Sequence, residues 1–487
     1  MTADPTPESV LATDLRAALV AADFTYDAVA EQLGQPAHRA LSRNETTPGV
    51  RRTTDGSPLS TLTRLFLLQT PVSVKEAERS LPGLVDRLCN VGLLEQSVGE
   101  VAARMDCRPY AGDDVDLWVV SDLTPGLDGA PIRVGADHVL GISSASTSLA
   151  QLTVRAEVGR ALDLGTGCGV QALHLATHAA EVVATDVNKR ALWMTRFNAA
   201  LNEVSVDVRE GSFFEPVAGE RFDLIATNPP FVISPATGER LVYRDSGLPG
   251  DRVVEDIVRT APAHLTEGGV CQVLANWSVV AGTPWDERLA QWLSEDSDAL
   301  VIQREVIDPS EYVEMWLKDE GVHGTPDYPR RYDTWLSWFG DQGIEGVGFG
   351  WINLRAGGSG SHRLEEWRYD VEQPIGPAIA DHFHATNREV DLTSRLAARP
   401  DVIQETQGPP GAEDPATIVL RQQRGFRRAR QVDTVEAALV GASDGDLSVG
   451  QLLAAIAELT DADADQLCTT YLPIGRELGD EGFLSST

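Results

Sequence analysis

The sequence predicts an α/β fold built on a mostly parallel sheet, and two observations support this prediction. From about residue 130, short apolar runs alternate with helical or loop segments, at 161–165, 181–187, 222–228 and 268–277. This alternation is typical of βαβ units, in which helices connect parallel strands. The first run also leads directly into a glycine-rich turn and then a helical segment, as at the ligand-binding edge of many such sheets. Two later apolar runs, 299–307 and 346–355, are expected to add strands.

The flanking segments predict an accessory domain on each side of this sheet. The 487 residues are too many for one ordinary core, because domains usually hold roughly 100–200 residues. Helical spacing followed by a strand at 114–123 predicts a helical or winged-helix-like domain over 1–108. The central domain is expected over 109–357, and a mainly helical second accessory domain over 358–487. The glycine- and serine-rich run 356–363 is expected to link the last two.

Composition and charge restrict the classes of function. The net charge of −33 disfavours nucleic-acid binding by the chain as a whole, because neutralised phosphates supply most of that affinity. No run approaches the ~18–20 apolar residues of a membrane helix and no signal-peptide pattern is visible, so a cytoplasmic protein without a membrane partner is expected. The five scattered cysteines are expected to be free thiols. His382 and His384 have no matching ligand set, so no metal site is expected.

One basic cluster runs against the overall charge. Five arginines fall within ten residues, at Arg421, Arg424, Arg427, Arg428 and Arg430. They could form a patch that grips RNA. They could instead lie on a solvated helix or strand face and balance local acids, and we favour this second interpretation.

The segment LDLGTGCG, residues 162–169, predicts a cofactor site. Glycines after a strand allow tight backbone angles and close approach of a ligand to main-chain N–H groups. A dinucleotide site uses the same device for a pyrophosphate, so the turn alone is ambiguous. Asp163, two positions before the first glycine, suits an ammonium group such as that of S-adenosylmethionine and would be poorly placed beside a pyrophosphate. Asp186 closes the next strand, at a spacing that suits ribose hydroxyls.

The strand at 222–228 ends in Asn228-Pro229-Pro230-Phe231, which predicts a catalytic loop. An amide or aryl amine is a poor nucleophile because its lone pair is delocalised. The side-chain carbonyl of Asn228 and the main-chain carbonyl of Pro229 can each accept one N–H of a target NH2 and so orient its nitrogen. The two prolines stiffen the loop, and Phe231 can stack on a planar target.

In this order, DLGTGCG, TDVN and NPPF resemble the HemK/PrmC-type amino-methyltransferases, over roughly residues 130–280. The resemblance implies a Rossmann-like class I methyltransferase sheet, mostly parallel with an antiparallel last strand, and S-adenosyl-L-methionine as cofactor. The family often carries an acid where this chain has Ser212, so the adenine contact departs from its pattern. Residues expected at the cofactor are Asp163, Gly165, Thr166, Gly167, Gly169, Asp186, Val187, Ser212, Phe213 and Asn228. Residues expected in catalysis are Asn228, Pro229, Pro230 and Phe231.

Three neighbouring segments each allow two interpretations. The run 137–153 is expected either to cross the cofactor pocket or to cap a helix. Arg244 and Asp245 could line the substrate entrance or form a surface ion pair. The aromatic run 309–342 is expected to be core rather than a substrate lid.

The sequence leaves the acceptor nitrogen open. A glutamine side chain in a protein, such as a translation factor, fits the acidic charge and the string NPPFVISP, which resembles the eukaryotic and archaeal glutamine-methylating branch. A base in structured rRNA or tRNA, guanine-N2 or adenine-N6, fits the accessory domains and the arginine cluster. A catalytically inactive interaction scaffold is opposed by the intact Asn228 loop. We prefer the glutamine hypothesis, and no oligomeric state is predicted.

Overall fold

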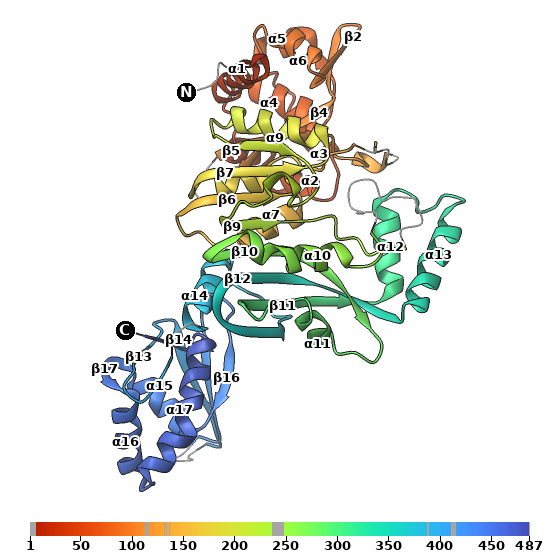
Figure 1. Cartoon of the computed structure of the whole chain (residues 1–487). Helices are drawn as coiled ribbons and strands as arrows, with labels where there is room; N and C mark the ends of the chain where they lie inside the picture. Colours follow the sequence, from red (N-terminus) through yellow and green to blue (C-terminus); the bar gives the residue numbers. More distant parts are fainter. Residues whose placement is uncertain are drawn as a thin grey trace.

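The computed structural model describes residues 6–112, 116–130, 132, 134–135, 137–235, 248–386, 389–410 and 415–486. A seven-stranded sheet forms its centre, with the N-terminal elements (red to orange) and the C-terminal elements (blue) at opposite ends (Figure 1). The strand order is β11-β12-β10-β9-β6-β7-β8. Its strands are β6 (Val158–Leu164), β7 (Ala179–Asp186), β8 (Asp207–Glu210), β9 (Phe222–Thr227), β10 (Leu265–Val280), β11 (Ser297–Ile307) and β12 (Ile344–Glu366).

Strand direction confirms the predicted fold class. β6 pairs in parallel with β7 and β9, β7 with β8, and β9 with β10. β12, the last strand of the sheet in the sequence, inserts antiparallel between β10 and β11. The result is the mostly parallel sheet with an antiparallel last strand that the sequence motifs imply.

Both faces of the sheet are covered, which explains why its strands are continuous apolar runs. Leu224 and Ala226 of β9 pack in one cluster with α7 and α8, whereas Ile225 packs on the other face with α10. The helices around the sheet are α7 (Ser144–Leu152), α8 (Val170–Leu175), α9 (Lys189–Leu201), η3 (Glu215–Val217), α10 (Arg252–Thr260), η4 (Ala261–His264) and α11 (Trp285–Ala290).

The aromatic run 309–342 forms a helical hairpin inserted between β11 and β12. Its helices are α12 (Pro309–Asp319) and α13 (Tyr328–Asp341). Tyr312, Trp335 and Phe339 are buried together with Val232 and Ile233, which follow the predicted catalytic loop. The core interpretation of these aromatic side chains is therefore confirmed, and Phe231 of that loop packs against their core.

The predicted linker at 356–363 is wrong, because these residues form a turn around a buried carboxylate. Asp298 pairs with Arg355 and accepts main-chain N–H bonds from Ser359 (3.1 Å) and Ser361 (2.9 Å). Gly358, at φ 96°, lies so close to Asp298 that a side chain there would collide with it. Beyond the turn the register places His362 beside Ala299 and Glu366 beside Gln303, so the chain stays in the sheet.

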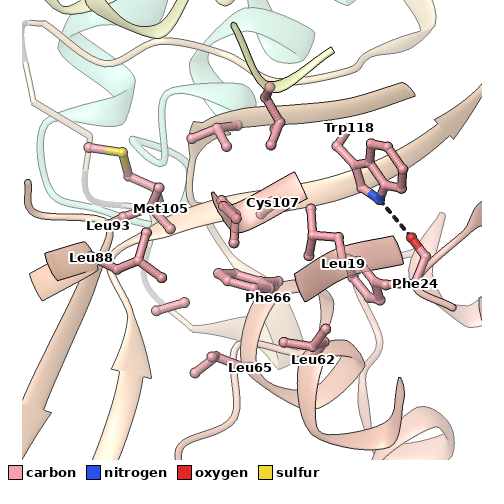
Figure 2. Packing of buried hydrophobic residues seen from close by; sticks show 14 of the residues in the cluster. Leu19, Phe24, Leu62, Leu65, Phe66, Leu88, Leu93, Met105, Cys107 and Trp118 are labelled. Carbon is pink, nitrogen blue, oxygen red and sulfur yellow. Dashed lines mark hydrogen bonds between the residues drawn. The ribbon is translucent and has the colours of Figure 1, made fainter. Parts of the chain in front are cut away.

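The N-terminal region combines helices with a small sheet of order β1-β3-β2, in line with the helical or winged-helix-like expectation. Its core, shown in Figure 2, packs Leu19, Phe66 and Cys107 beneath Trp118, whose indole N–H donates to the Phe24 carbonyl (2.7 Å). The elements are α1 (Pro7–Ala21), α2 (Tyr26–Leu41), α3 (Thr47–Arg52), α4 (Pro58–Leu62), η1 (Thr63–Leu67), β1 (Val72–Ser73), α5 (Val74–Ser80), α6 (Val85–Asn90), β2 (Leu94–Ser97), β3 (Glu100–Ala103), β4 (Met105–Ala111), β5 (Asp116–Asp122) and η2 (Leu127–Gly129).

The C-terminal region holds more strand than the sequence suggested, although helices still predominate. Two three-stranded sheets, β17-β13-β18 and β14-β15-β16, accompany its helices. The elements are α14 (Gly376–Thr386), β13 (Arg395–Ala398), β14 (Val402–Gln407), β15 (Thr417–Gln422), β16 (Ala429–Val432), α15 (Thr434–Ala442), β17 (Asp444–Ser448), α16 (Val449–Thr460), α17 (Ala464–Asp480) and β18 (Leu484–Ser486). Within the described ranges, no helix is both long and apolar enough to cross a membrane. The domain boundaries at 108/109 and 357/358 stay predictions.

The arginine cluster lies along β15, β16 and the turn between them, and its charge is balanced by carboxylates. Arg421 pairs with Glu405 and Arg424 with Glu372. Arg428 is buried between the rings of Trp367 and Phe426 and pairs with Glu365. Arg430 contacts Glu436, Glu477 and Glu481. For these four arginines, the interpretation that they balance local acids is confirmed.

Two asparagines, Asn198 on α9 and Asn202 at its C-terminal cap, attach the N-terminal region to the central sheet. Asn198 accepts a hydrogen bond from Val120 N–H and donates to the Val120 carbonyl, both at 2.8 Å. Asn202 makes the same pair of bonds with Trp118, at 2.9 and 2.7 Å. Each side-chain amide thus bonds the N–H and the carbonyl of one β5 residue, as a neighbouring strand would. We call Asn198 and Asn202 the asparagine clamp.

Replacing Asn198 with alanine should destabilise the protein. Asn198 also donates to the Cys168 carbonyl (2.8 Å), so the change leaves three buried main-chain groups without their partner. We expect the free energy of unfolding to fall by about 2–4 kcal/mol, since each unpaired buried group costs about 1–3 kcal/mol before relaxation. Urea unfolding followed by tryptophan fluorescence measures this. Lys189→Ala on the same helix, whose side chain is 82% exposed, is the control, and equal stability of the two variants would contradict the clamp.

Candidate active site

Three parallel strands, β6, β7 and β9, bring the predicted site residues to one edge of the sheet. The turn after β6 is held against β7 because the N–H groups of Gly165 and Thr166 both donate to the Thr185 carbonyl, at 2.9 Å each. Gly165 (φ 77°) and Gly167 (φ 57°) have left-handed backbone conformations that favour glycine. A Cβ added to either would meet no atom within 4 Å, so these glycines face open space. Such a turn leaves room for a ligand close to the backbone.

Asp163 is fully buried under this turn and holds it to the next helix. Its Oδ2 accepts the Thr166 hydroxyl (2.6 Å) and the N–H of Ala172 in the first turn of α8 (2.9 Å). Burial raises the pKa of Asp163 to about 7, against the lowering effect of these two hydrogen bonds. Because burial disfavours the charged carboxylate, a nearby cation such as the ammonium group of the cofactor would stabilise it. Its contact with that group stays a prediction.

Asp186, at the end of β7, connects the glycine-rich turn with α9. Its two carboxylate oxygens accept the N–H groups of Gly167 (2.9 Å) and Asn188 (2.8 Å). Burial raises its pKa. The next side chain, Val187, is 64% exposed, which is unusual for a valine at the end of a core strand and leaves an apolar surface for a flat ring. The predicted roles of Asp186 at the ribose and of Val187 at the cofactor fit this placement and stay predictions.

Ser212 and Phe213 lie beside Asp186, since Gly211 N–H donates to the Asp186 carbonyl (3.0 Å). Phe213 has φ 44°, a conformation uncommon for a bulky residue and often found at functional sites. Glu215, three residues after Ser212, accepts the Ser212 N–H (3.3 Å). The sequence motifs assign Glu215 no role.

The predicted catalytic loop starts at the end of β9, which is tied to β6 by a bond from the Thr227 hydroxyl to the Leu164 carbonyl (2.7 Å). Asn228 follows directly, and its side-chain Oδ1 is buried without a hydrogen-bond partner. Pro229 is buried and Pro230 half-buried. The loop is held from outside by the α12 aromatic residues. Phe231 lies edge-on to Trp316, with ring centroids 6.5 Å apart, and Ile233 N–H donates to the Tyr312 hydroxyl (2.8 Å).

The run 137–153 contains the helix cap that was one of its two interpretations. Ser143 caps α7, with reciprocal bonds between Ser143 and Ser146. The Ser146 carbonyl accepts from Gln171 in the first turn of α8 (2.7 Å), which places this end of α7 beside the glycine-rich turn. Passage of the segment across the cofactor pocket stays a prediction. Arg244 and Asp245 lie outside the described residues.

Two further residues lie at this edge although no sequence motif marks them. Thr195 of α9 is buried and donates from its hydroxyl to the Gly167 carbonyl (3.0 Å), which helps to fix the turn. Asn276 of β10 is 2% exposed, and its side-chain Nδ2 has no hydrogen-bond partner. Neither belongs to a motif, and only the fold brings them to the site. His382 and His384, by contrast, contact main-chain carbonyls of Asp480 and Ala380 in the C-terminal region.

Comparison with known protein families agrees with this geometry. A family model described as the methyltransferase small domain matches residues 141–289, and one described as a domain of unknown function matches residues 21–104. Assignment to the S-adenosylmethionine-dependent methyltransferases is thereby confirmed for the segment 141–289, which contains every predicted site residue.

Curated relatives of this segment differ in their acceptors. The chain is 37% identical to a release factor glutamine methyltransferase of Xylella fastidiosa, over 24% of this chain and 47% of that protein. It is 34% identical to a ribosomal protein uL3 glutamine methyltransferase of Bradyrhizobium diazoefficiens, over 30% and 50%. It is 29% identical to a ribosomal RNA small subunit methyltransferase C of Erwinia tasmaniensis, over 36% and 46%. The chain thus spans about half the length of the curated relatives it matches.

The raised pKa of Asp163 predicts a pH dependence of stability. Its folded pKa of about 7 exceeds the ordinary value of 3.8, so the fold favours the neutral carboxyl. This contribution is complete below about pH 4 and is lost as pH rises through about 7, by up to about 4 kcal/mol. An amide does not titrate, so Asp163→Asn should lack this part of the dependence. Urea unfolding of both proteins at pH 5 and pH 7.5 measures it, and an identical change with pH in the two would contradict the burial of a titrating carboxyl.

Proposed function

We propose that this chain is an S-adenosylmethionine-dependent N-methyltransferase whose acceptor is the side-chain amide of a protein glutamine. The observation that carries the proposal is the Oδ1 of Asn228, which is buried without a hydrogen-bond partner. Asn228 lies at the same edge of the sheet as the glycine-rich turn and Asp186. A buried carbonyl without a donor costs about 1–3 kcal/mol. An acceptor NH2 group would supply that donor at the place where methyl transfer is expected.

The cofactor residues fit S-adenosylmethionine by position and chemistry. Asp163 offers a buried carboxyl for its ammonium group, Asp186 a carboxylate for its ribose hydroxyls, and Val187 an apolar surface for its adenine. The open space before Gly165 and Gly167 lets the ligand approach the turn. When bound, S-adenosylmethionine supplies an electrophilic methyl group.

The chain's own part in the reaction is then to position the acceptor nitrogen. Asn228 Oδ1 and the Pro229 carbonyl each accept one N–H, which favours a pyramidal nitrogen with its lone pair directed at the methyl carbon. Methyl transfer to this nitrogen would break the methyl–sulfur bond of the bound cofactor, and the nitrogen would lose one proton. Carbonyl oxygens are too weakly basic to keep that proton, so it passes to solvent. Pro229 and Pro230 have no N–H groups of their own that could compete for these acceptors.

Several features support a protein acceptor over an RNA acceptor. The net charge is −33, and four arginines of the basic cluster are paired with glutamates. An open groove of about 820 Å³ between the N-terminal sheet and the start of α9 is lined by charges of both signs. Its cations are paired, Arg104 with Glu95 and Arg190 with Asp122. A groove of mixed, paired charge suits a polypeptide better than a polyanion.

An rRNA base is the second candidate, because one of the relatives above is a ribosomal RNA methyltransferase. The Erwinia tasmaniensis protein matches 36% of this chain, more than the glutamine methyltransferases do. A guanine or adenine amine would present an NH2 group to Asn228 in the same way.

The acceptor class can be measured directly. Purified protein and S-adenosylmethionine labelled in the methyl group are incubated with lysate of a strain that lacks this gene. We expect the label to survive RNase and to be lost to protease, with methylglutamine found by mass spectrometry in peptides from a protease digest. Label removed by RNase would replace the glutamine assignment with base methylation. Label in neither fraction would contradict a macromolecular acceptor.

The catalytic loop can be tested in the same assay. Asn228→Ala removes the acceptor for one N–H, and we expect transfer to fall by at least about 100-fold, as for other preorganised polar groups at reacting centres. Cofactor binding, measured by calorimetry, should stay within about twofold of wild type, because Asn228 Oδ1 is assigned to the acceptor amine and Asn228 is one of ten residues expected at the cofactor. Methyl transfer by Asn228→Ala at the wild-type rate would show that Asn228 has no role in catalysis.

A further inference from the structure

Asn276 lies next to the catalytic loop, on the strand beside it. β10 pairs in parallel with β9 up to Val273 opposite Thr227, and both chains continue beyond this pair at the edge that holds the site. Strands rise about 3.3 Å per residue and lie about 4.8 Å apart, so the Cα atoms of Asn228 and Asn276 are roughly 8 Å apart. One small planar group fits between two amide side chains at this separation.

Asn276 also lies on the face of the sheet that is opposite α10. Cys271, Val273, Ala275 and Trp277 pack in the cluster on the α10 face, so the alternation of β10 places Asn276 on the opposite face, together with Gln272. Leu224 and Ala226 of β9 pack on that opposite face, and Asn228 follows directly after the last residue of this strand, Thr227. Phe349, opposite Asn276 on β12, lies with its ring centroid 6.0 Å from that of Tyr312. Asn276 therefore borders the aromatic cluster that also holds the loop.

The side-chain atoms of Asn228 and Asn276 that lack hydrogen-bond partners are complementary. Asn228 lacks a partner for Oδ1, an acceptor, and Asn276 lacks a partner for Nδ2, a donor. The fold thus leaves a buried acceptor on Asn228 and a buried donor on Asn276 at the edge where the Thr185 hydroxyl of β7 is also buried without a partner. A ligand that satisfies both asparagines must carry a donor and an acceptor close together.

We propose that Asn276 is a positioning residue that donates from Nδ2 to the carbonyl oxygen of the acceptor amide. A primary carboxamide carries NH2 and C=O side by side at its tip, so it meets Asn228 with an N–H and Asn276 with its oxygen. This inference rests on the proposed function and adds a means of selection. A glutamate carboxylate offers no N–H to Asn228, and an alkyl amine offers no oxygen to Asn276.

The test compares Asn276→Leu with a matched change of another buried amide on the same face. Leucine has nearly the shape of asparagine but no donor. Since Nδ2 has no partner in the protein, we expect the free energy of unfolding to be unchanged or higher. Asn353 is the control, because its amide accepts from Gln272 (2.9 Å) and donates to the Leu300 carbonyl (3.0 Å), so Asn353→Leu should lower stability or prevent folding.

Activity is measured as methyl transfer to the RNase-treated protein fraction of the lysate that lacks this gene. We expect kcat/KM of Asn276→Leu to fall by about 10- to 100-fold, as for loss of one buried hydrogen bond to the substrate. Asn276→Asp, which keeps the size but loses the donor, should fall at least as far. Calorimetry with S-adenosylmethionine alone should stay within about twofold of wild type for both.

Each outcome separates this inference from the proposed function. Methylglutamine formed by Asn276→Leu at the wild-type rate would overturn the inference alone. If Asn276→Leu lost as much stability as Asn353→Leu, Asn276 would have a structural role in the core. That outcome would also overturn the inference. A methylated base in place of methylglutamine would overturn the proposed function, whatever the stability of the variant.

Discussion

The geometry of the site depends on the buried carboxylate of Asp163. Through one oxygen it holds Thr166 and the start of α8, and so fixes how the chain leaves β6. The neighbouring carboxylate of Asp186 holds Gly167 from β7. Together the two acids shape the glycine-rich turn from both sides, although burial disfavours the charged form of each. A cationic ligand at this edge would reduce that cost, so the same acids that shape the turn also favour the ligand.

The turn is linked to the N-terminal region through α9. Asn198 binds β5 with its amide and also donates to the carbonyl of Cys168, between two glycines of the turn. Thr195, one helical turn earlier, donates to the carbonyl of Gly167. A shift of β5 relative to α9 would therefore break bonds that reach the turn itself. This connection gives the N-terminal region, which borders the mixed-charge groove, a direct physical route to the cofactor site.

The sequence predicted the parts that depend on local patterns, and missed those that depend on distant contacts. The alternating apolar runs predicted the sheet, and the DLGTGCG, TDVN and NPPF motifs predicted Asp163, Asp186 and Asn228 at one edge. The glycine run 356–363 resembled a linker because glycine suits both flexible segments and tight turns. Only the buried Asp298, some 60 residues earlier in the chain, requires the turn. Asn276 likewise sits in an apolar strand with no motif to mark it.

Gln272 shows that unmatched amides such as those of Asn228 and Asn276 are not a general feature of this sheet. It lies on the same strand and face as Asn276, yet it accepts from Val154 N–H (2.7 Å) and donates to the Leu152 carbonyl (2.8 Å) and to Asn353 (2.9 Å). The fold can therefore satisfy a buried amide four residues earlier on the same face of the same strand. Unpaired polar atoms are expensive enough to be rare in cores. In Asn228 and Asn276 the unpaired atoms are an acceptor and a donor, and Asn228 directly precedes Pro229 and Pro230. This arrangement fits a site that is completed by its substrate.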